Sequence, residues 1–310
     1  RLLAKLRESG IDAWTFTDPR YPLSLKNIHD PPVNLYVHGK PRETDFNYTG
    51  AIVGTRRPTA YGQKIAKETG RGLSESGATV ISGMAIGIDS IAHWGAIEGG
   101  GRTVAVLGCV PDVCYPSSNR KLFREILDND RGLIVSEYFP GITPEPFRFP
   151  ARNRVIAGLS RGIVVIEGGV QSGSLITAHQ AFEQNREVFA FPGRVDSEMS
   201  AGPHWLIATQ KAQLVSSYRD VLHHLNWVQT AIKAETAVVE LYGREKEIYD
   251  LLTTDPVHFD DLCQTTGMPA GELSATLTML ELAGVATRIS GDFYTRYTPG
   301  SAPSSAPAST

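Results

Sequence analysis

Four arginines gather in the segment FRFPARNRVIAGLSRG, residues 147–162, which contains no carboxylate to balance their charge. Guanidinium groups present rigid forks of donors that match phosphate oxygens. The net charge of the whole chain is nevertheless −3, which argues against a protein that coats nucleic acid through bulk positive charge. We therefore expect any anion site to be local, with these arginines as its first candidates.

The run VIAGL predicts a helix that packs its apolar side on a sheet, with Arg152, Asn153 and Arg154 near its first turn. We expect these three residues to face a ligand, and Arg148 to be an outer contact. Phe147 adds a planar face on which an unpaired base can stack.

A purely structural role is the alternative for this segment. The arginines could pair with sequence-distant carboxylates such as Glu137 or Glu167, and the phenylalanines could be core residues. We favour this interpretation for Phe149 and for Arg161, which directly precedes an apolar strand. Each glutamate closes a predicted strand, so the two could instead serve as a general acid and base in an enzyme.

Four glycine-containing loops follow predicted strands: GTRRPTAYG at 54–62, SGMAIGID at 82–89, EGGVQSGSLITAHQA at 167–181 and FPGRVDSEMSAG at 191–202. Glycine lets the backbone approach a ligand closely, and the free N–H groups of a helix start attract negative oxygen atoms. Each loop is thus a candidate phosphate cradle, and Gly54, Thr55 and Arg194 are candidate contacts. None matches a P-loop or a dinucleotide fingerprint, so ATP and nicotinamide cofactors are poor candidates.

Some side chains in this part of the chain could suggest catalysis. Ser172, Ser174 and His179 could be drawn as nucleophile and base, but Ser174 followed by Thr177 is more typical of helix capping. His93 lies in an amphipathic helix, and we interpret it as a packing residue. We therefore assign no catalytic residue.

The elements that must position these loops alternate between short β-branched runs and helical stretches from Gly50 to about Val215. This alternation predicts a doubly wound, mostly parallel α/β sheet of Rossmann type, with ligand bound at the carboxyl ends of the strands. The predicted strands are 51–54, 79–82, 103–108, 133–137, 162–167, 187–193 and 212–215. The predicted helices include 60–76, 88–98, 122–128, 174–185 and 204–210.

The flanking segments have a different character. Residues 1–49 indicate an N-terminal helical remnant followed by a strand around 35–38, and residues 50–225 form the Rossmann-like domain. Residues 226–243 are a plausible linker, and 244–297 suggest three helices and a hairpin turning at 290–292, in the order of a winged helix. The Pro- and Ser-rich tail, 298–310, is expected to be disordered.

The remaining composition excludes several classes of protein. No apolar run approaches the roughly 20 residues that a membrane span needs, and the N-terminus lacks the features of a signal peptide. Cys109, Cys114 and Cys263 are an odd set without metal-ligand spacing, so neither a disulfide framework nor a zinc site is suggested. We expect a cytoplasmic protein without a bound metal.

The chain resembles the DNA-processing protein A (DprA, or Smf) family of bacteria over about residues 20–215. The motifs that carry the resemblance, in family order, are YPLSLKNIHDPPVNLYVHG, AIVGTRRPTAYG, VISGMAIGIDSIAHWGAI, TVAVLGCVPDVCYPSSN, SEYFPG, FPARNRVIAGLS, SGSLITAHQA and FPG. The resemblance implies an extended Rossmann fold that binds single-stranded DNA in a basic pocket, dimerises, and helps to load the RecA recombinase in natural transformation. It implies neither catalysis nor a cofactor.

Carried onto this chain, the family's DNA-pocket positions lie in the glycine loops and in the arginine segment. They are Arg56, Ser82, Gly83, Arg152, Asn153 and Arg154, together with Ser172, Gly173 and Ser174. Many family members follow the FPG segment with a glycine and an asparagine, whereas this chain has SAGPHWLI, with His204 near that place.

The third helix of the C-terminal module, ELSATLTMLELAGV, contains two glutamates and no basic residue. A winged helix that reads duplex DNA normally brings arginine or lysine to the major groove with this helix. With Leu273, Leu277 and Leu280 spaced for one buried face, the other face would repel phosphate. We predict that this helix does not bind duplex DNA, and that the module contacts protein or regulates access instead.

The residues favour a non-enzymatic binder of single-stranded DNA, and the resemblance implies that it protects incoming DNA and acts with RecA, as a homodimer. The alternative is a nucleotide phosphoribohydrolase of the lysine-decarboxylase-like Rossmann group, which usually carries PGGxGTxxE. The corresponding loop here, EGGVQSGSLITA, has Thr177 and Ala178 where the acid–base glutamate is expected. A scaffold without nucleic-acid affinity is the third possibility, and the uncompensated arginines argue against it.

Overall fold

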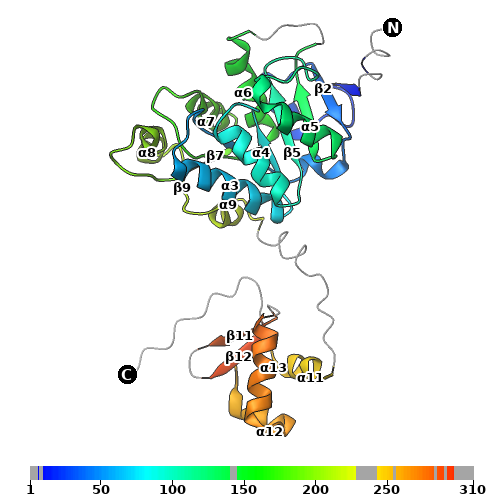
Figure 1. Cartoon of the computed structure of the whole chain (residues 1–310), viewed down its shortest axis with the longest axis vertical. Helices are drawn as coiled ribbons and strands as arrows, with labels where there is room; N and C mark the ends of the chain where they lie inside the picture. Colours follow the sequence, from blue (N-terminus) through cyan, green and yellow to red (C-terminus); the bar gives the residue numbers. More distant parts are fainter. Residues whose placement is uncertain are drawn as a thin grey trace. The chain divides into compact units, whose positions relative to one another are not determined.

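The computed structural model describes residues 6, 10–139, 145–227, 243–253, 256–282, 285–289 and 292–296. The chain divides into two units, Arg1–Ala231 and Ile232–Thr310 (Figure 1). The described part of the first unit contains a nine-stranded sheet in the order β1-β2-β6-β5-β4-β3-β7-β8-β9. The described part of the second contains a small three-stranded sheet with helices.

Seven strands of the large sheet run parallel, as the alternation of strand and helix predicts. They are β3 (Thr49–Val53), β4 (Thr79–Ser82), β5 (Thr103–Leu107), β6 (Gly132–Ser136), β7 (Gly162–Val165), β8 (Glu187–Ala190) and β9 (Gln213–Leu214). Every residue of β3 to β7 is buried, because helices cover both faces of the sheet. The predicted fold class is confirmed.

Helices flank the sheet in two layers, and alternate residues of one strand point to opposite layers. In β3, Val53 packs with the cluster of α6, whereas Ile52 packs with that of α3 and α4. The helices of the first cluster are α2 (Leu23–Lys26), α6 (Arg148–Leu159), α7 (Gly173–Glu183) and α8 (Ala201–Ala208). Those of the other face are α3 (Ala60–Glu75), α4 (Ile88–Glu98), α5 (Arg120–Asp128) and α9 (Tyr218–His224).

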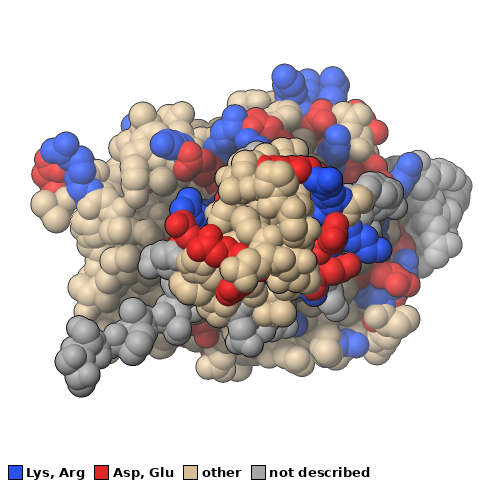
Figure 2. Space-filling model, turned by 90° about the horizontal axis from the view of Figure 1, so that it is seen from below, with Lys and Arg blue, Asp and Glu red and all other residues tan. Residues whose placement is uncertain are grey.

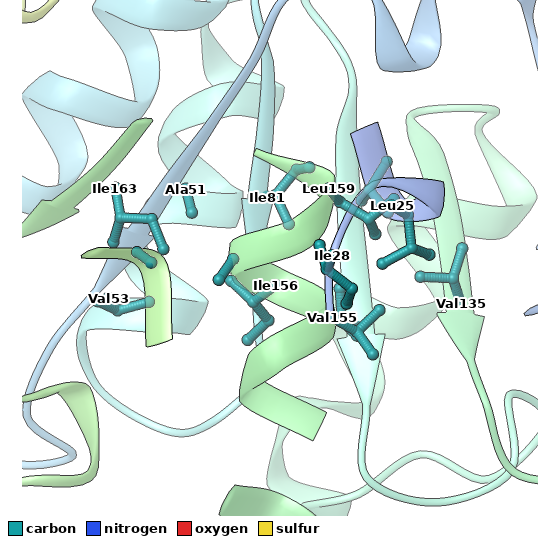
Figure 3. Close-up of a cluster of buried hydrophobic side chains, with 14 of the residues drawn as sticks. Leu25, Ile28, Ala51, Val53, Ile81, Val135, Val155, Ile156, Leu159 and Ile163 are labelled. Atoms are coloured by element: carbon teal, nitrogen blue, oxygen red, sulfur yellow. The ribbon is translucent and has the colours of Figure 1, made fainter. Parts of the chain in front are cut away.

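Helix α6 contacts both the hydrophobic core and the carboxyl ends of the strands. Its apolar side, with Val155, Ile156 and Leu159, lies in a cluster that also contains Val53 and Ile163 of the strands (Figure 3). Its first turns, which carry the arginines, are thereby held near the carboxyl ends of the parallel strands. Short 3-10 turns at Glu43–Phe46, Ser117–Asn119 and Glu198–Ser200 connect other elements.

The N-terminal segment extends the sheet. Strand β2 (Asn34–Gly39) lies where a strand was predicted at 35–38, and it pairs antiparallel with β6. Strand β1 (Ile11–Thr15) pairs antiparallel with β2, and the sequence analysis did not predict it. Its buried residues, Ile11 and Trp14, are three positions apart, so the segment lacks the alternating pattern of a half-buried strand.

The second unit has three described helices and a β-sheet in the order β10-β12-β11. The elements are α11 (Gly243–Leu251), β10 (Val257–His258), α12 (Phe259–Thr266), α13 (Ala270–Leu282), β11 (Ala286–Ile289) and β12 (Phe293–Arg296). Leu273, Leu277 and Leu280 of α13 are buried, so the predicted buried face of this helix is confirmed. Helices followed by an antiparallel hairpin give the winged-helix order.

Parts of the predicted organisation lie outside the described residues. These are most of the first nine residues, positions 228–242 of the proposed linker, the hairpin residues 290–291, and the tail from 298 onward. Trp227, at the beginning of that linker, is buried in the core of the first unit with Leu222 and Val221 of α9.

Charged residues are distributed without a dominant sign on the face shown in Figure 2, where basic and acidic side chains lie interspersed among uncharged ones. This matches the small net charge of −3. Among the described residues, no helix combines the length and apolar character needed to cross a bilayer.

Candidate nucleic-acid interface

The order of the parallel strands reverses between β3 and β7, which is where an open α/β sheet forms its ligand crevice. A cavity of about 830 Å³ opens there, lined by the loops after β3 and β7 and by the first turns of α6. Eight of the predicted site residues line it: Gly54, Thr55, Arg56, Arg152, Asn153, Ser172, Gly173 and Ser174. The sequence therefore predicted the centre of this cavity from three separate segments.

The loop after β3 carries the two most accessible cations of the cavity. Arg56 and Arg57 are exposed and line it, and among the described residues neither takes part in an ion pair. Gly54 allows the loop to pass close to its neighbours, because a Cβ there would lie 2.6 Å from Ile88 Cγ1 and 2.9 Å from the Glu167 carbonyl oxygen. The backbone N–H of Thr55 donates to that same carbonyl oxygen at 2.7 Å.

Glu167 acts as an anchor for this loop. Its carboxylate accepts hydrogen bonds from the Thr59 N–H at 2.9 Å and from the Thr59 hydroxyl at 2.6 Å. Thr59 is the N-cap of α3, and its side chain accepts from the Gly62 N–H. Glu167 is 2% exposed and does not line the cavity, so this geometry offers no support for a general acid or base at this residue.

The start of α7 forms a second wall of the cavity. Ser172 caps the helix by accepting from the Ser174 N–H at 3.3 Å, and the two hydroxyl oxygens are 2.8 Å apart. A Cβ at Gly173 would meet no atom within 4 Å, so the backbone of this turn faces open space. His179 instead lies near Glu183, at 3.4 Å, on an exposed turn. The capping interpretation is confirmed, with Ser172 rather than Ser174 as the cap.

Arg152 forms the floor of the cavity and is almost fully buried, with 6% of its surface exposed. Its guanidinium donates to the carbonyl oxygens of Gly83, at 2.7 Å, and of Val106. The buried Asp89 carboxylate accepts from the Gly83 N–H at 3.1 Å and balances the arginine's charge. Burial raises the pKa of the Asp89 carboxyl, and the Arg152 guanidinium opposes this rise. Arg152 thus joins the cavity to its supporting strands, with much of its hydrogen-bonding capacity already used.

Arg154 corrects a prediction, because it does not line the cavity with Arg56. Its guanidinium forms a bidentate pair with Glu137, at 2.6 and 3.1 Å, and bonds to Asp30 at 3.0 Å. Residues two positions apart on a helix are separated by about 200° around its axis. Arg154 therefore points away from the side that Arg152 occupies. The structural alternative, pairing with a sequence-distant carboxylate, is correct here.

Other predicted residues also lie apart from the cavity lining. Ser82 and Gly83 are buried beneath it: the Ser82 hydroxyl donates to the Ile52 carbonyl at 2.7 Å, and a Cβ at Gly83 would collide with the Arg152 guanidinium. In this structure they support the floor. Arg194 is paired with Asp196 at 2.8 Å on the surface and does not line the cavity, so this geometry gives no support to the prediction that it is a contact.

The aromatic residues of the arginine segment lie differently from the prediction. Phe147, predicted as a stacking surface, is 66% exposed and absent from the cavity lining, and the Arg148 guanidinium lies 5.4 Å from its ring centroid. Arg148 is likewise not in the lining. Phe149, predicted as a core residue, lines the cavity beside Tyr115, which the sequence analysis did not select. Their proximity depends on tertiary contacts between distant segments, so it left no signal in the sequence.

Two further predictions concern histidines. His93 is buried as a packing residue, and its Nδ1 lies 2.6 Å from Thr103 Oγ1. Because that hydroxyl donates to the Val80 carbonyl, Nδ1 is the donor of the pair. Burial lowers the pKa of His93 to about 3. His204, where the chain departs from the family pattern, lies with Nε2 3.1 Å from the Gly193 carbonyl oxygen, and so bonds to the FPG loop.

Comparison with known proteins places this geometry in a family. The sequence profile of DNA recombination-mediator protein A matches residues 12–226, and that of the DprA winged helix domain matches residues 233–292. The DNA processing protein DprA of Streptococcus pneumoniae is 43% identical over 210 residues, which is 68% of this chain and 73% of that protein. DprA of Bacillus subtilis is 39% identical over 225 residues, or 73% and 75% of the two chains.

Solved structures agree with the sequence comparison. The X-ray structure of S. pneumoniae DprA superposes with a TM-score of 0.64 at 41% identity, covering 71% of this chain and 77% of that one. DNA processing protein A of Helicobacter pylori, whose structure concerns its single-stranded DNA binding mode, superposes with a TM-score of 0.62 at 30% identity, covering 70% and 95%. Both the doubly wound sheet and the winged-helix module thus have family counterparts, and the chain is a member of the DNA recombination-mediator protein A (DprA/Smf) family, which is a family of DNA-processing mediators rather than of enzymes.

Proposed function

We propose that this protein binds single-stranded DNA in the cavity at the carboxyl ends of β3 and β7. The observation that carries the proposal is the pair Arg56 and Arg57, two exposed cations without a carboxylate partner among the described residues, on the rim of an 830 Å³ cavity. The start of α7 adds backbone donors at Ser172 to Ser174 for phosphate oxygens. The single-stranded DNA binding of the H. pylori relative supports the same ligand.

The cavity suits backbone recognition with little reading of sequence. Arginines and helix-start N–H groups contact phosphates, which position a strand but do not distinguish bases. With Arg56 and Arg57 as the main phosphate contacts, the slope of log affinity against log salt for a single strand should be about −1.4. Between 50 and 200 mM salt the affinity should therefore fall only about sevenfold.

Binding of a fluorescent oligo-dT to single variants tests this proposal. Arg56→Ala and Arg57→Ala should each weaken binding and should each reduce the salt slope by about 0.7, because each removes one phosphate contact. Arg194→Ala is the matched control, since it removes an exposed arginine that is paired with Asp196 outside the cavity. Unchanged affinity in both rim variants would contradict the assignment of this cavity.

We also propose the wider role that the family resemblance implies: protection of incoming DNA and loading of RecA, by a homodimer in the cytoplasm. The family's role in DNA processing supports this proposal, and the three cysteines, all free, are compatible with a reducing compartment. A strand-exchange assay in which single-stranded DNA is first coated by a competing binding protein tests it. Addition of this protein should restore RecA filament formation, and Arg56→Ala should not.

A further inference from the structure

The loop between β5 and α5 contains two cysteines, Cys109 and Cys114, which the proposed strand binding does not use. Cys109 is buried, with 1% of its surface exposed, and Cys114 is partly buried against the same apolar cluster. Both are free thiols. Tyr115 directly follows Cys114 and lines the cavity, so a change of the loop at Cys114 moves part of the cavity wall.

The loop folds back so that its two cysteines come close together. The Val113 N–H donates to the Val110 carbonyl oxygen at 3.2 Å, which closes a turn between the cysteines. The Cys109 Sγ lies 3.6 Å from the carbonyl oxygen of Val113, the residue that precedes Cys114. A carbonyl oxygen lies about 2.8 Å from the next Cα in a planar peptide, so the Cys109 Sγ is at most about 6.4 Å from the Cys114 Cα. A small movement of the loop therefore brings the two sulfur atoms to bonding geometry.

The two thiols have different surroundings, which give them different roles. Burial raises the pKa of the Cys109 thiol to about 11, so this sulfur is protonated and shielded from solvent. Burial also raises the pKa of the Cys114 thiol, but this residue is partly exposed, and the Arg120 guanidinium favours its thiolate. Accessible cysteines near cations are the ones that react first with a disulfide. Cys114 is therefore the thiol that meets an oxidant, and Cys109 is the second thiol that completes the bond.

Both ends of the loop are held in place, whereas its middle is exposed. The Ser136 hydroxyl donates to the Cys109 carbonyl oxygen at 2.6 Å, and the Asn119 side-chain amide donates to the Met84 carbonyl oxygen at 2.8 Å. The exposed residues between these anchors are Asp112, Val113, Tyr115, Ser117 and Ser118. Because these side chains are exposed, the middle of the loop can move without disrupting the core. An S–S bond therefore draws Cys114 toward the anchored Cys109 and moves Tyr115 with it.

We propose that Cys109 and Cys114 form a reversible redox-modification site, in which a low-molecular-weight disulfide oxidises the pair and lowers the affinity of the cavity for single-stranded DNA. The Cys114 thiolate attacks the small disulfide, forms a mixed disulfide and releases one thiol. The Cys109 thiolate then displaces the second thiol and forms the Cys109–Cys114 bond. The protein loses two electrons and two protons, and the small disulfide gains them as it becomes two thiols.

The proposal rests on the proposed function, because it regulates binding in the same cavity. It also agrees with a reducing compartment, where disulfides are usually transient and serve to sense oxidants. The reduced pair is then the resting form, and the bond forms when the ratio of small disulfide to thiol rises.

A glutathione redox buffer tests the bond itself. The full-length protein is equilibrated at about pH 8 over a series of ratios of oxidised to reduced glutathione, and its thiols are then blocked with N-ethylmaleimide under denaturing conditions. Mass spectrometry should find three adducts on the reduced protein and one, on Cys263, on the oxidised protein. Cys109→Ser should instead retain a mixed disulfide with glutathione at Cys114. Three free thiols at every ratio overturn the proposal.

Oligo-dT binding tests the regulation. The oxidised wild-type protein should bind oligo-dT about 5- to 150-fold more weakly than the reduced protein, the usual range for coupling between two sites, and dithiothreitol should restore binding. In oxidising buffer Cys114→Ser should bind like the reduced wild type. Cys263→Ser is the matched control, because it keeps both loop cysteines and should respond like the wild type.

Coupling is reciprocal, so saturating oligo-dT should raise the ratio of oxidised to reduced glutathione needed for half-oxidation by the same factor. Equal affinity of the oxidised and reduced proteins, or a response that is lost in Cys263→Ser, overturns the redox site. Failure of the proposed function has a different signature. The reduced wild-type protein would then not bind oligo-dT, while the thiol count, which needs no DNA, would still report the Cys109–Cys114 bond.

Discussion

Arg56 and Arg152 both line the cavity, but their surroundings give their charges different uses. Arg56 is exposed and outside any ion pair of the described residues, so its charge is available to a ligand. Arg152 is buried, feels the charge of Asp89 and donates to two backbone carbonyl groups, so its guanidinium mainly holds the cavity floor together. Replacing either arginine should weaken DNA binding, but for separate physical reasons.

Arg152→Ala should lower the free energy of unfolding by at least about 1–3 kcal/mol, because it leaves buried carbonyl oxygens of Gly83 and Val106 without their donor and removes a cation that favours the Asp89 carboxylate. Adding Asp89→Asn to this variant should recover part of the loss, since it removes the stranded charge and keeps an acceptor for the Gly83 N–H. Urea denaturation measures both effects. Arg56→Ala, the exposed counterpart, should change the free energy of unfolding by less than about 0.5 kcal/mol. Equal stability of the Arg152→Ala and Arg56→Ala proteins would refute the supporting role.

The buried, neutral His93 should make the free energy of unfolding depend on pH. Its folded pKa of about 3 lies below the unfolded value of about 6.5, so between these values the unfolded chain binds a proton that the folded protein does not. Stability contributed by the neutral ring is therefore present above about pH 6.5 and is lost as the pH falls toward 3. His93→Asn, whose amide can replace Nδ1–H as donor to Thr103, should flatten the pH dependence of the unfolding free energy by up to about 1.4 kcal/mol per pH unit. Denaturation at pH 7.5, 6 and 5 checks this, and an unchanged slope would show that His93 does not titrate in this range.

At the scale of elements, two glycines in turns at the cavity have different roles: one is required for packing of the fold, and the other leaves space where a ligand would bind. A side chain at Gly54 would collide with Ile88 and with the Glu167 backbone, whereas a side chain at Gly173 would extend into open space. Gly54 is required because β3 and α4 pack closely there. Gly173 is required only if a ligand approaches the start of α7.

Gly54→Ala should therefore lower both thermal stability and oligo-dT affinity, because the loop that carries Arg56 must shift. Gly173→Ala should fold at least as well as the wild type, because alanine is a better helix former than glycine at an uncrowded helical position. It should nevertheless weaken oligo-dT binding, since its methyl group occupies the space in front of the α7 N–H groups. Thermal melting and fluorescence anisotropy separate the two effects, and a loss of stability in Gly173→Ala would be inconsistent with this geometry.

The fold was predictable to the extent that each element has a local pattern. Helix α4 and strand β4 begin and end at the predicted residues, because β-branched runs and amphipathic periodicity are local signals. Strand β1 was missed because its buried residues do not alternate. The cavity was predictable where glycines and arginines follow strands, as at Gly54 and Arg56.

Side-chain direction was less predictable than backbone position. The spacing Arg-x-Arg at residues 152–154 suggested a shared ligand, but the helix turns Arg154 to the opposite side, toward Glu137. The neighbours of Phe149 come from a loop more than thirty positions earlier in the chain, and only the assembled sheet brings them together. The sequence therefore indicated which loops form the site, while tertiary packing decided which of their side chains face it.

At the scale of the whole molecule, the chain combines a cavity-bearing unit with a winged helix whose third helix carries no basic residue. On α13, Glu272 and Glu281 are the charged residues, and Glu272 is paired with Arg244. The exposed Met279 belongs to the same helix. We propose that this module contacts protein or regulates access to the cavity, and that it does not bind duplex DNA through α13.

Removal of residues 243–310 should leave oligo-dT affinity within a factor of about two, because every described residue of the cavity belongs to the first unit. Affinity for a duplex of the same length should be weak in the full chain, and it should not fall on truncation. Anisotropy titrations of both proteins with both ligands provide the four values. A duplex affinity that is present in the full chain and lost on truncation would assign duplex binding to the winged helix.

The anchoring of the β3–α3 loop by Glu167 has a consequence for the thermodynamics of binding. One residue holds both ends of the loop: its carbonyl oxygen accepts from Thr55 and its carboxylate accepts from Thr59. Fixing the backbone of each loop residue costs about 1–2 kcal/mol of conformational entropy, and here that cost is incurred during folding. A strand arriving at the loop has only the side chains of Arg56 and Arg57 left to immobilise, at about 0.5–1.5 kcal/mol each. The loop is thus preorganised, and an arginine in it can bind a phosphate more tightly than the same arginine in a flexible loop.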